Sequence, residues 1–265
     1  MTTLEGFTES TFTFEGDTKA VFRAGTGPAV LVISEIPGIT PAVAAFARRV
    51  VDIGCTAVMP SLFGTPGREI SVPYVLDSMS RACISKEFAT WAANKTSPMT
   101  VWCKALARHE HELCGGPGVG VVGMCLTGNF ALAMMVDPVV AAPVLSQPSL
   151  PFPITKAMKA DLNVSPEDLA AVKARCEAEP DLCVLGLRFT GDPLSPGSRF
   201  ETLRQALGDS FVGVEIDSSK GNVHHIRAKA HSVLTEDLVD EPGHPTKDAL
   251  DQVLDLFRSR LLDAG

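Results

Sequence analysis

The chain has 265 residues, of which 45% are hydrophobic and 20% charged, a length and composition that suit one α/β domain with a large core. Its 23 Lys and Arg against 31 Asp and Glu give a formal charge of −8, so the basic surface that attracts nucleic acid or anionic membranes is not expected. The amino-terminal sequence MTTLEGFTES does not resemble a signal peptide, and Asp137 and Pro138 interrupt the most apolar stretch. We therefore expect a single domain over residues 1–265, with no membrane segment, that acts on a small molecule.

The seven cysteines show no spacing typical of a disulfide framework. An odd number of scattered cysteines in a chain without an export signal favours reduced thiols. This pattern predicts a cytoplasmic location.

The first half of the chain alternates predicted strands and helices. Alternating apolar positions predict an antiparallel hairpin over residues 11–23, around Gly16 and Asp17. The continuous apolar run at 29–34 indicates a parallel strand that is covered on both faces. Pro41 opens a helix that ends before Gly54, because proline is tolerated in a first helical turn. Further elements are predicted as a strand at 56–60, helices at 75–95 and 98–114, and a strand at 119–124.

The second half continues this alternation. Ser165 is a predicted helix N-cap, followed by Pro166 and by the acidic Asp168, and it opens a helix at 166–178. The other predicted elements are a helix at 129–136, a strand at 139–146, a proline-rich loop at 148–153, a strand at 182–191, a helix at 199–207, a strand at 211–217, a short helical stretch at 233–238 and a closing helix at 247–262. The order predicts an α/β fold whose mostly parallel central sheet carries helices on both faces.

The turn after the strand at 119–124 is the first candidate for chemistry. Gly123-Met-Cys125-Leu-Thr-Gly128 leads directly into a helix, and a strand, sharp turn and helix are the setting of a nucleophile elbow. Glycines permit the crowded backbone, and the amides of the following helix favour a thiolate. Cys125 could also be a small buried hydrophobic residue, as free cysteines often are. No Gly-x-Ser-x-Gly occurs in the chain.

A thiol nucleophile needs a base and an acid that orients it, and in this kind of fold the acid precedes the histidine in the chain. Asp192 follows the strand at 182–191, where open α/β sheets place their sites, although an ordinary turn before Pro193 also explains it. His231 lies in the loop after the strand at 211–217 and is the preferred base, with His224 and His225 as alternatives in the same segment.

Glu35 ends the strand at 29–34, an expensive position for a carboxylate unless it is hydrogen-bonded or used. It could simply cap the sheet. If Glu35 faces Cys125, the backbone N–H groups of Ile36 and Leu126 would converge and could form an oxyanion hole.

Two weaker patterns predict neither a cofactor nor a metal. Gly118 to Gly123 fits Gly-x-Gly-x-x-Gly, but its glycines lie before and within the strand, which argues against dinucleotide binding. Cys103, His111 and Cys114 share a helix without the paired spacing of zinc sites.

Five segments together resemble the dienelactone hydrolase family of α/β hydrolases. They are SEIPGI around Glu35, MPSLFG at 59–64, GMCLTG around Cys125, FTGDP around Asp192 and AKAHS around His231. The resemblance covers most of the chain and implies the α/β-hydrolase fold, with Cys125 as nucleophile, His231 as base and Asp192 as acid. It also implies that Glu35 contacts the resting, protonated thiol and releases it when substrate shifts the carboxylate.

The sequence departs from the family pattern at two places. Thr127 stands where the family usually has a glycine, so either the helix and strand pack slightly further apart or the turn differs locally. The family holds a substrate carboxylate with arginines, one of them soon after the catalytic histidine, whereas His231 is followed by Ser-Val-Leu-Thr. Arg81 is a candidate for the other arginine. The arginine that would hold a substrate carboxylate in a bidentate contact is missing, so the sequence does not identify the substrate as a dienelactone. The residues that carry out hydrolysis are all retained.

The resulting hypothesis is hydrolysis of a small ester or lactone through a Cys125 thioester, with no cofactor, by a monomer or small homo-oligomer. A non-catalytic binding protein on the same scaffold is the first alternative. A flavin- or nucleotide-binding doubly wound protein is the second, because fold alone does not fix function.

Overall fold

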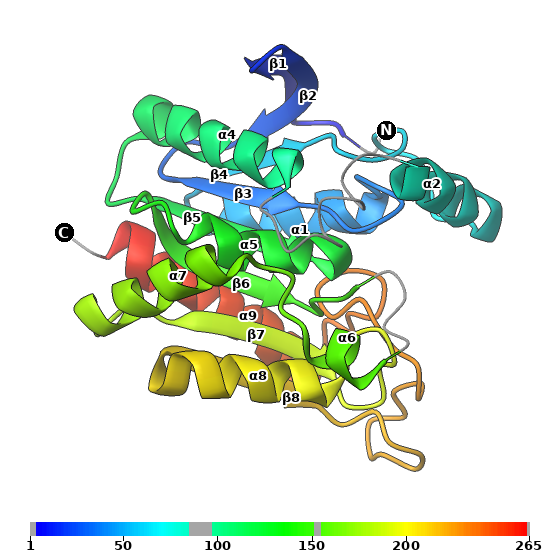
Figure 1. Ribbon diagram of the computed structural model, residues 1–265. Helices are drawn as coiled ribbons and strands as arrows, with labels where there is room; N and C mark the ends of the chain where they lie inside the picture. Colours follow the sequence, from blue (N-terminus) through cyan, green and yellow to red (C-terminus); the bar gives the residue numbers. More distant parts are fainter. Residues whose placement is uncertain (1–3, 85–96, 151–154, 264–265) are drawn as a thin grey trace.

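The computed structural model describes residues 4–84, 97–150 and 155–263, with the side chains of 81–84 left out. Its centre is an eight-stranded sheet of order β1-β2-β4-β3-β5-β6-β7-β8. β1 and β2 are antiparallel, β2 joins β4 antiparallel, and every pair from β4 to β8 is parallel. This mostly parallel sheet with helices on both faces (Figure 1) confirms the predicted fold class.

The strands and helices follow the predicted alternation. The strands are β1 Thr8–Phe14, β2 Asp17–Ala24, β3 Ala29–Ile33, β4 Thr56–Pro60, β5 Val119–Met124, β6 Val140–Ser146, β7 Val184–Phe189 and β8 Phe211–Ile216. The α-helices are α1 Pro41–Asp52, α2 Val72–Ile84, α4 Pro98–Cys114, α5 Gly128–Met134, α6 Lys156–Ala160, α7 Pro166–Ala178, α8 Gly197–Leu207 and α9 Pro245–Phe257. Short 3₁₀ turns lie at Cys125–Thr127 and Gly208–Ser210, and a π-helical turn at Arg258–Leu262 extends α9.

Several local features differ from the prediction. The hairpin turn lies at Glu15 and Gly16, one residue earlier than predicted. Both residues have positive φ (49° and 82°), as a two-residue hairpin turn requires, and Phe14 pairs with Asp17. The helix predicted at 75–95 begins at Val72, and residues 85–96 lie outside the described residues, as do 151–154 of the predicted proline-rich loop. The short helix α6 has no counterpart in the prediction.

The helical stretch predicted at 233–238 is not formed, and residues 233–237 form turns. The Asp237 carboxylate accepts hydrogen bonds from the backbone N–H groups of His231 (2.8 Å) and Ser232 (3.1 Å). Such side-chain to backbone bonds compete with helix formation. The buried Val233 and Leu234 therefore pack into the core from a loop.

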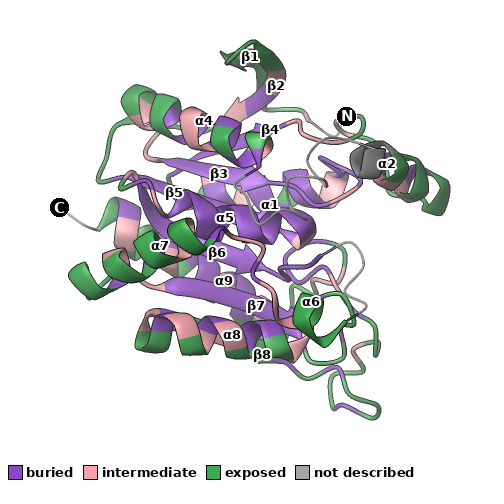
Figure 2. Ribbon diagram, in the orientation of Figure 1, coloured by how far each residue is buried: buried purple, intermediate pink, exposed green. Residues whose placement is uncertain are grey.

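Each face of the sheet has its own hydrophobic core, and Figure 2 shows the strands as mostly buried between partly exposed helices. On β3, Leu31 and Ile33 face the cluster that contains residues of α4, α5, α7 and α8, whereas Val30 and Val32 face the cluster with α1 and α9. Since side chains alternate along a strand, a strand covered on both sides is apolar throughout. Within the described residues, no helix is both long and apolar enough to span a membrane.

The junction between β5 and α5 is a sharp turn at Cys125, whose φ is 57°. A non-glycine residue in this region is strained and is retained only where its surroundings fix it. A Cβ atom at Gly123 would lie 2.0 Å from the Thr127 carbonyl oxygen, so only glycine fits there. The buried Thr127 hydroxyl accepts a hydrogen bond from the Met124 N–H (2.9 Å) and donates to the Ile33 carbonyl (2.8 Å). These bonds join the turn to the end of β3.

We predict that Thr127→Val lowers the free energy of unfolding by about 1–3 kcal/mol, because the buried Met124 N–H loses its acceptor while the side-chain volume is kept. Denaturant unfolding measures the change. The control is Thr202→Val on α8, whose hydroxyl makes an exposed hydrogen bond to the Ser198 carbonyl of the same helix. This substitution should change stability by no more than about 0.5 kcal/mol. Equal effects at both positions would contradict the role given to Thr127.

Candidate active site

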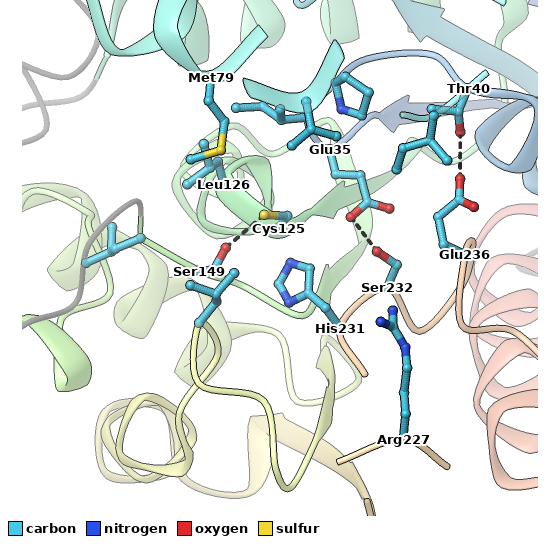
Figure 3. Close-up of a pocket in the computed structure, with 16 residues that line it drawn as sticks. Glu35, Thr40, Met79, Cys125, Leu126, Ser149, Arg227, His231, Ser232 and Glu236 are labelled. Carbon is cyan, nitrogen blue, oxygen red and sulfur yellow. Dashed lines mark hydrogen bonds between the residues drawn. The ribbon is translucent and has the colours of Figure 1, made fainter. Parts of the chain in front are cut away.

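A cavity of about 280 Å³ lies over the carboxyl ends of the parallel strands (Figure 3). Open α/β sheets bind ligands at this edge, where several strand ends meet. The cavity is lined by residues from distant parts of the chain, namely Glu35, Ile36, Pro37, Thr40, Ile70, Val75, Met79, Cys125, Leu126, Ser149, Leu150, Leu194, Arg227, His231, Ser232 and Glu236. Half of them are apolar.

Cys125 is partly buried at the floor of this cavity, and Ser149 is its direct partner. The Cys125 sulfur and the Ser149 hydroxyl are 3.0 Å apart, and the Ser149 N–H donates to the Cys125 carbonyl over 3.0 Å. Asn129 of α5 donates to the Ser149 carbonyl. The loop after β6 is thus fixed against the turn at Cys125 by side-chain and backbone bonds.

His231 and Asp192 form a hydrogen-bonded pair beside Cys125. Nδ1 of His231 lies 2.7 Å from Oδ2 of the buried Asp192, so Nδ1 carries the proton that this bond uses. Nε2 is buried and has no hydrogen-bond partner in the described part of the structure. A ring nitrogen of His231, the Cys125 sulfur and a Glu35 oxygen all lie within 4.8 Å of one another. The structure therefore brings together the four side chains that the sequence singled out.

The surroundings of His231 favour its charged form. Burial by itself disfavours an imidazolium, but the negative charge of Cys125 and the hydrogen bond to Asp192 outweigh burial and raise the pKa of His231 well above its usual range. His231 therefore tends to be protonated in this site, next to the Cys125 sulfur.

Glu35 is buried, but its partners are hydroxyl groups and not the thiol. Its oxygens accept from the hydroxyls of Ser232 (2.8 Å) and Thr235 (2.5 Å), and Gln147 Nε2 donates more weakly over 3.4 Å. The contact with the thiol that the family resemblance implied is not among its hydrogen bonds. The S, N and O atoms of Cys125, His231 and Glu35 are a donor set that Zn²⁺ accepts in principle, although the carboxylate oxygens are already used.

The remaining candidates are placed as follows. Ile36 and Leu126 both line the cavity, as an oxyanion hole requires. Arg81 is in the last turns of α2, but its side chain lies outside the described residues. His224 and His225 do not line the cavity, and His224 packs edge-on against His244 instead. Of the three histidines, it is His231 that meets Asp192.

The sequence matches a known protein family over most of its length. The model of the dienelactone hydrolase family matches residues 17–261. The chain belongs to the dienelactone hydrolase family. No curated protein matches the sequence.

Solved structures agree with this family in fold. The protein m3DLH is 17% identical with a TM-score of 0.63, and the match covers 96% of this chain and 98% of that one. The dienelactone hydrolase-like promiscuous phosphotriesterase P91 from metagenomic libraries is 14% identical with a TM-score of 0.61, covering 96% and 98%. A cold-adapted esterase from an Arctic intertidal metagenomic library is 14% identical with a TM-score of 0.59, covering 97% and 95%.

This family member also holds a buried arginine under the site. Arg199 of α8 is fully buried and forms no ion pair among the described residues. Its guanidinium donates to four backbone carbonyls, one in α6 and three in loops, those of Met158 (3.1 Å), Pro148 (2.7 Å), Asp161 (2.7 Å) and Leu194 (3.3 Å). Burial lowers its pKa to about 10, against the opposing charges of Asp161, Asp192 and Cys125, so it stays a cation at neutral pH. Arg199 therefore ties the loops that carry Ser149 and Asp192 to α8.

Ser149 and Arg199 were not predicted. Ser149 lies just past the end of β6, where the polar run Ser146-Gln147 was visible in the sequence. Polar residues at the carboxyl end of a parallel strand are a usable signal. For Arg199 no local signal exists, because its four acceptors are main-chain atoms.

We predict that Arg199→Lys lowers the free energy of unfolding by about 1–3 kcal/mol, since an ammonium cannot reach four carbonyls held by a planar guanidinium. Denaturant unfolding measures it. Arg204→Lys on the same helix is the matched control, because Arg204 is only partly buried and its ion pairs among the described residues are with Glu201 and Glu215. Its change should stay below about 1 kcal/mol. Equal losses in both variants would show that the hydrogen bonds from Arg199 to buried carbonyls do not account for the loss of stability.

Proposed function

We propose that the protein hydrolyses small esters or lactones through a thioester formed on Cys125. The observation that carries this proposal is the meeting of Cys125, at the strained turn, with the His231 and Asp192 pair at the floor of one cavity. Membership of a hydrolase family supports the reaction class. Nucleophile, base and orienting acid are the three parts that acyl transfer needs.

In the first half of the reaction, the Cys125 sulfur attacks the carbonyl carbon of the ester, and the thiol proton is held by His231 Nε2. The carbonyl electrons move to oxygen, where the N–H groups of Ile36 and Leu126 stabilise the oxyanion. Collapse of this intermediate re-forms the carbonyl and breaks the bond to the leaving alcohol, which takes the proton from His231. The acyl group remains on Cys125 as a thioester.

In the second half, water attacks the thioester and gives a proton to His231 Nε2. The tetrahedral intermediate expels the sulfur, the carboxylic acid leaves, and the imidazolium and thiolate are restored. Asp192 holds the ring in one tautomer throughout. Glu35 acts in this scheme on the His231 loop, through the hydroxyl of Ser232, and not on the sulfur.

The first test is hydrolysis of p-nitrophenyl acetate by Cys125→Ala and by His231→Ala. We expect kcat/KM to fall by about 10³-fold or more in each, and the double variant to lose little beyond the single ones, because the two residues act as a unit. Cys114→Ala is the matched control, since Cys114 is also partly buried but far along α4.

Unchanged turnover in Cys125→Ala would overturn the thioester mechanism. A folded wild-type protein that hydrolyses no ester of a broad panel, and whose Cys125 reacts with iodoacetamide no faster than the buried cysteines, would favour the non-catalytic binding protein instead.

The raised pKa of His231 gives a pH prediction. Asp192→Asn removes the anionic acceptor, so the pKa of His231 should fall and the imidazolium should disappear at lower pH than in the wild type. At about pH 7 His231 is then protonated in fewer molecules, and labelling of Cys125 by iodoacetamide, which is favoured by a positive charge beside the sulfur, should slow by about tenfold, which corresponds to a shift of one pKa unit. Asp209→Asn, an exposed position after α8, is the control. Equal labelling rates in wild type and Asp192→Asn would contradict the pairing.

A further inference from the structure

The cavity over Cys125 continues as an apolar strip along α2 to the surface. Val72, Val75, Leu76 and Met79 are spaced i, i+3, i+4 and i+7, so they lie on one face of this helix. Met79 and Val75 line the cavity, and Met79 points toward Leu126 near Cys125 in Figure 3. Val75 also lines a second, shallower hollow with Val72, Leu76 and Ile70. Ile70 and Val75 belong to both, so the two hollows share a wall.

The outer half of this strip is exposed to an unusual extent. Val72 is 75% exposed, Leu76 62% and Ile70 43%, whereas an apolar stripe on a helix normally faces the core. A cluster of exposed apolar side chains next to a cavity marks a binding surface more often than a structural one.

The exposed residues Val72 and Leu76 are not what holds α2 in place. Another face of the helix does this through Tyr74 and Ser78, which are both 3% exposed. The Tyr74 hydroxyl accepts from the Thr65 N–H (2.6 Å) and donates to the Thr65 carbonyl (3.1 Å), and Arg68 lies over its ring. Since α2 is anchored by this face, the residues Val72 and Leu76 are available for a ligand.

The charged side chains among the described lining residues give little support to an anionic substrate. Glu35 and Glu236 are the acidic ones, and the basic ones are Arg227 and His231, of which His231 is paired with Asp192. Arg227 already pairs with both oxygens of Asp237, at 2.6 and 2.9 Å. A guanidinium used in this way offers little to a substrate carboxylate, and the wall from Met79 to Val72 offers only apolar contact.

We propose that the substrate carries a neutral, flexible hydrocarbon chain, which runs from the ester group at Cys125 past Met79 and Val75 onto Val72 and Leu76 of α2. This inference rests on the proposed function and names its substrate class. It differs from the carboxylate-bearing substrates that the family resemblance implied.

The test is a series of p-nitrophenyl esters from acetate to octanoate, together with a series of acetates of linear alcohols, so that a chain on the acyl side is distinguished from one on the alcohol side. In one of the two series, kcat/KM should rise about fourfold for each added methylene that contacts the strip. The double variant Val72→Asn, Leu76→Gln should lose about fivefold or more on the longest ester, mainly through KM, and nothing on acetate.

Val223→Asn is the matched control, because Val223 is 83% exposed and lies in a different hollow beside β8. It should leave both short and long esters unaffected. Chain-length preference in the wild type is informative even if the double variant does not fold, and circular dichroism reports on its folding.

Three results would overturn the inference while leaving the proposed function intact. These are Cys125-dependent turnover with no chain-length dependence in either series, an equal loss on acetate and octanoate in the double variant, and a wild-type dimer that the double variant dissociates without a change in chain preference. The last outcome would make the strip a subunit contact. If acetate turnover itself does not depend on Cys125, the proposed function fails first.

Discussion

The hydrogen bonds of the Thr127 hydroxyl are the contact on which the geometry of the site depends. This single oxygen binds the main chain of β5 at Met124 and the main chain of β3 at Ile33. The ends of these two strands carry Cys125 with Leu126, and Glu35 with Ile36. A strained φ at Cys125 persists only if its neighbours fix it, and Thr127 together with the close contact at Gly123 does so. The residue that departs from the family pattern therefore has a structural function in this chain.

Two carboxylates organise the other side of the site without being part of the proposed chemistry. Asp237 binds the amides of His231 and Ser232 and the guanidinium of Arg227, and Glu35 binds the hydroxyls of Ser232 and Thr235. The loop from His231 to Asp237 has no regular secondary structure, so its shape is set by these bonds. Side-chain hydrogen bonds thus give a loop the precision that a histidine needs to meet both Asp192 and a sulfur.

Much of the fold and the grouping of the site could be predicted from local patterns. The apolar runs at β3 and β5 and the proline and serine signals of α1 and α7 are local, and the glycines around Cys125 reveal the turn without any tertiary information. Asp192 and His231 could be selected because the order of acid and histidine in this kind of fold is fixed. The turns at 233–237 could not be predicted in this way. The Asp237 carboxylate binds the N–H groups of residues five and six positions earlier, and these bonds compete with the helix that the local pattern favours. Ser149 and Arg199 depend on contacts between loops that are distant in sequence.

The arrangement around Glu35 changes how the sulfur is controlled. In the scheme implied by the family, a glutamate restrains the thiol until substrate displaces it. Displacing Glu35 here would break the hydrogen bonds that Ser232 and Thr235 donate to its two carboxyl oxygens, at a cost of about 3–6 kcal/mol for the two. A neutral ester has no charge with which to offset this cost, and Gln147 adds a further donor. Glu35 is therefore best understood as a fixed part of the His231 loop. The Ser149 hydroxyl contacts the sulfur at 3.0 Å, whereas His231 and Glu35 face it within 4.8 Å. Access to the sulfur depends on the partly apolar cavity above it.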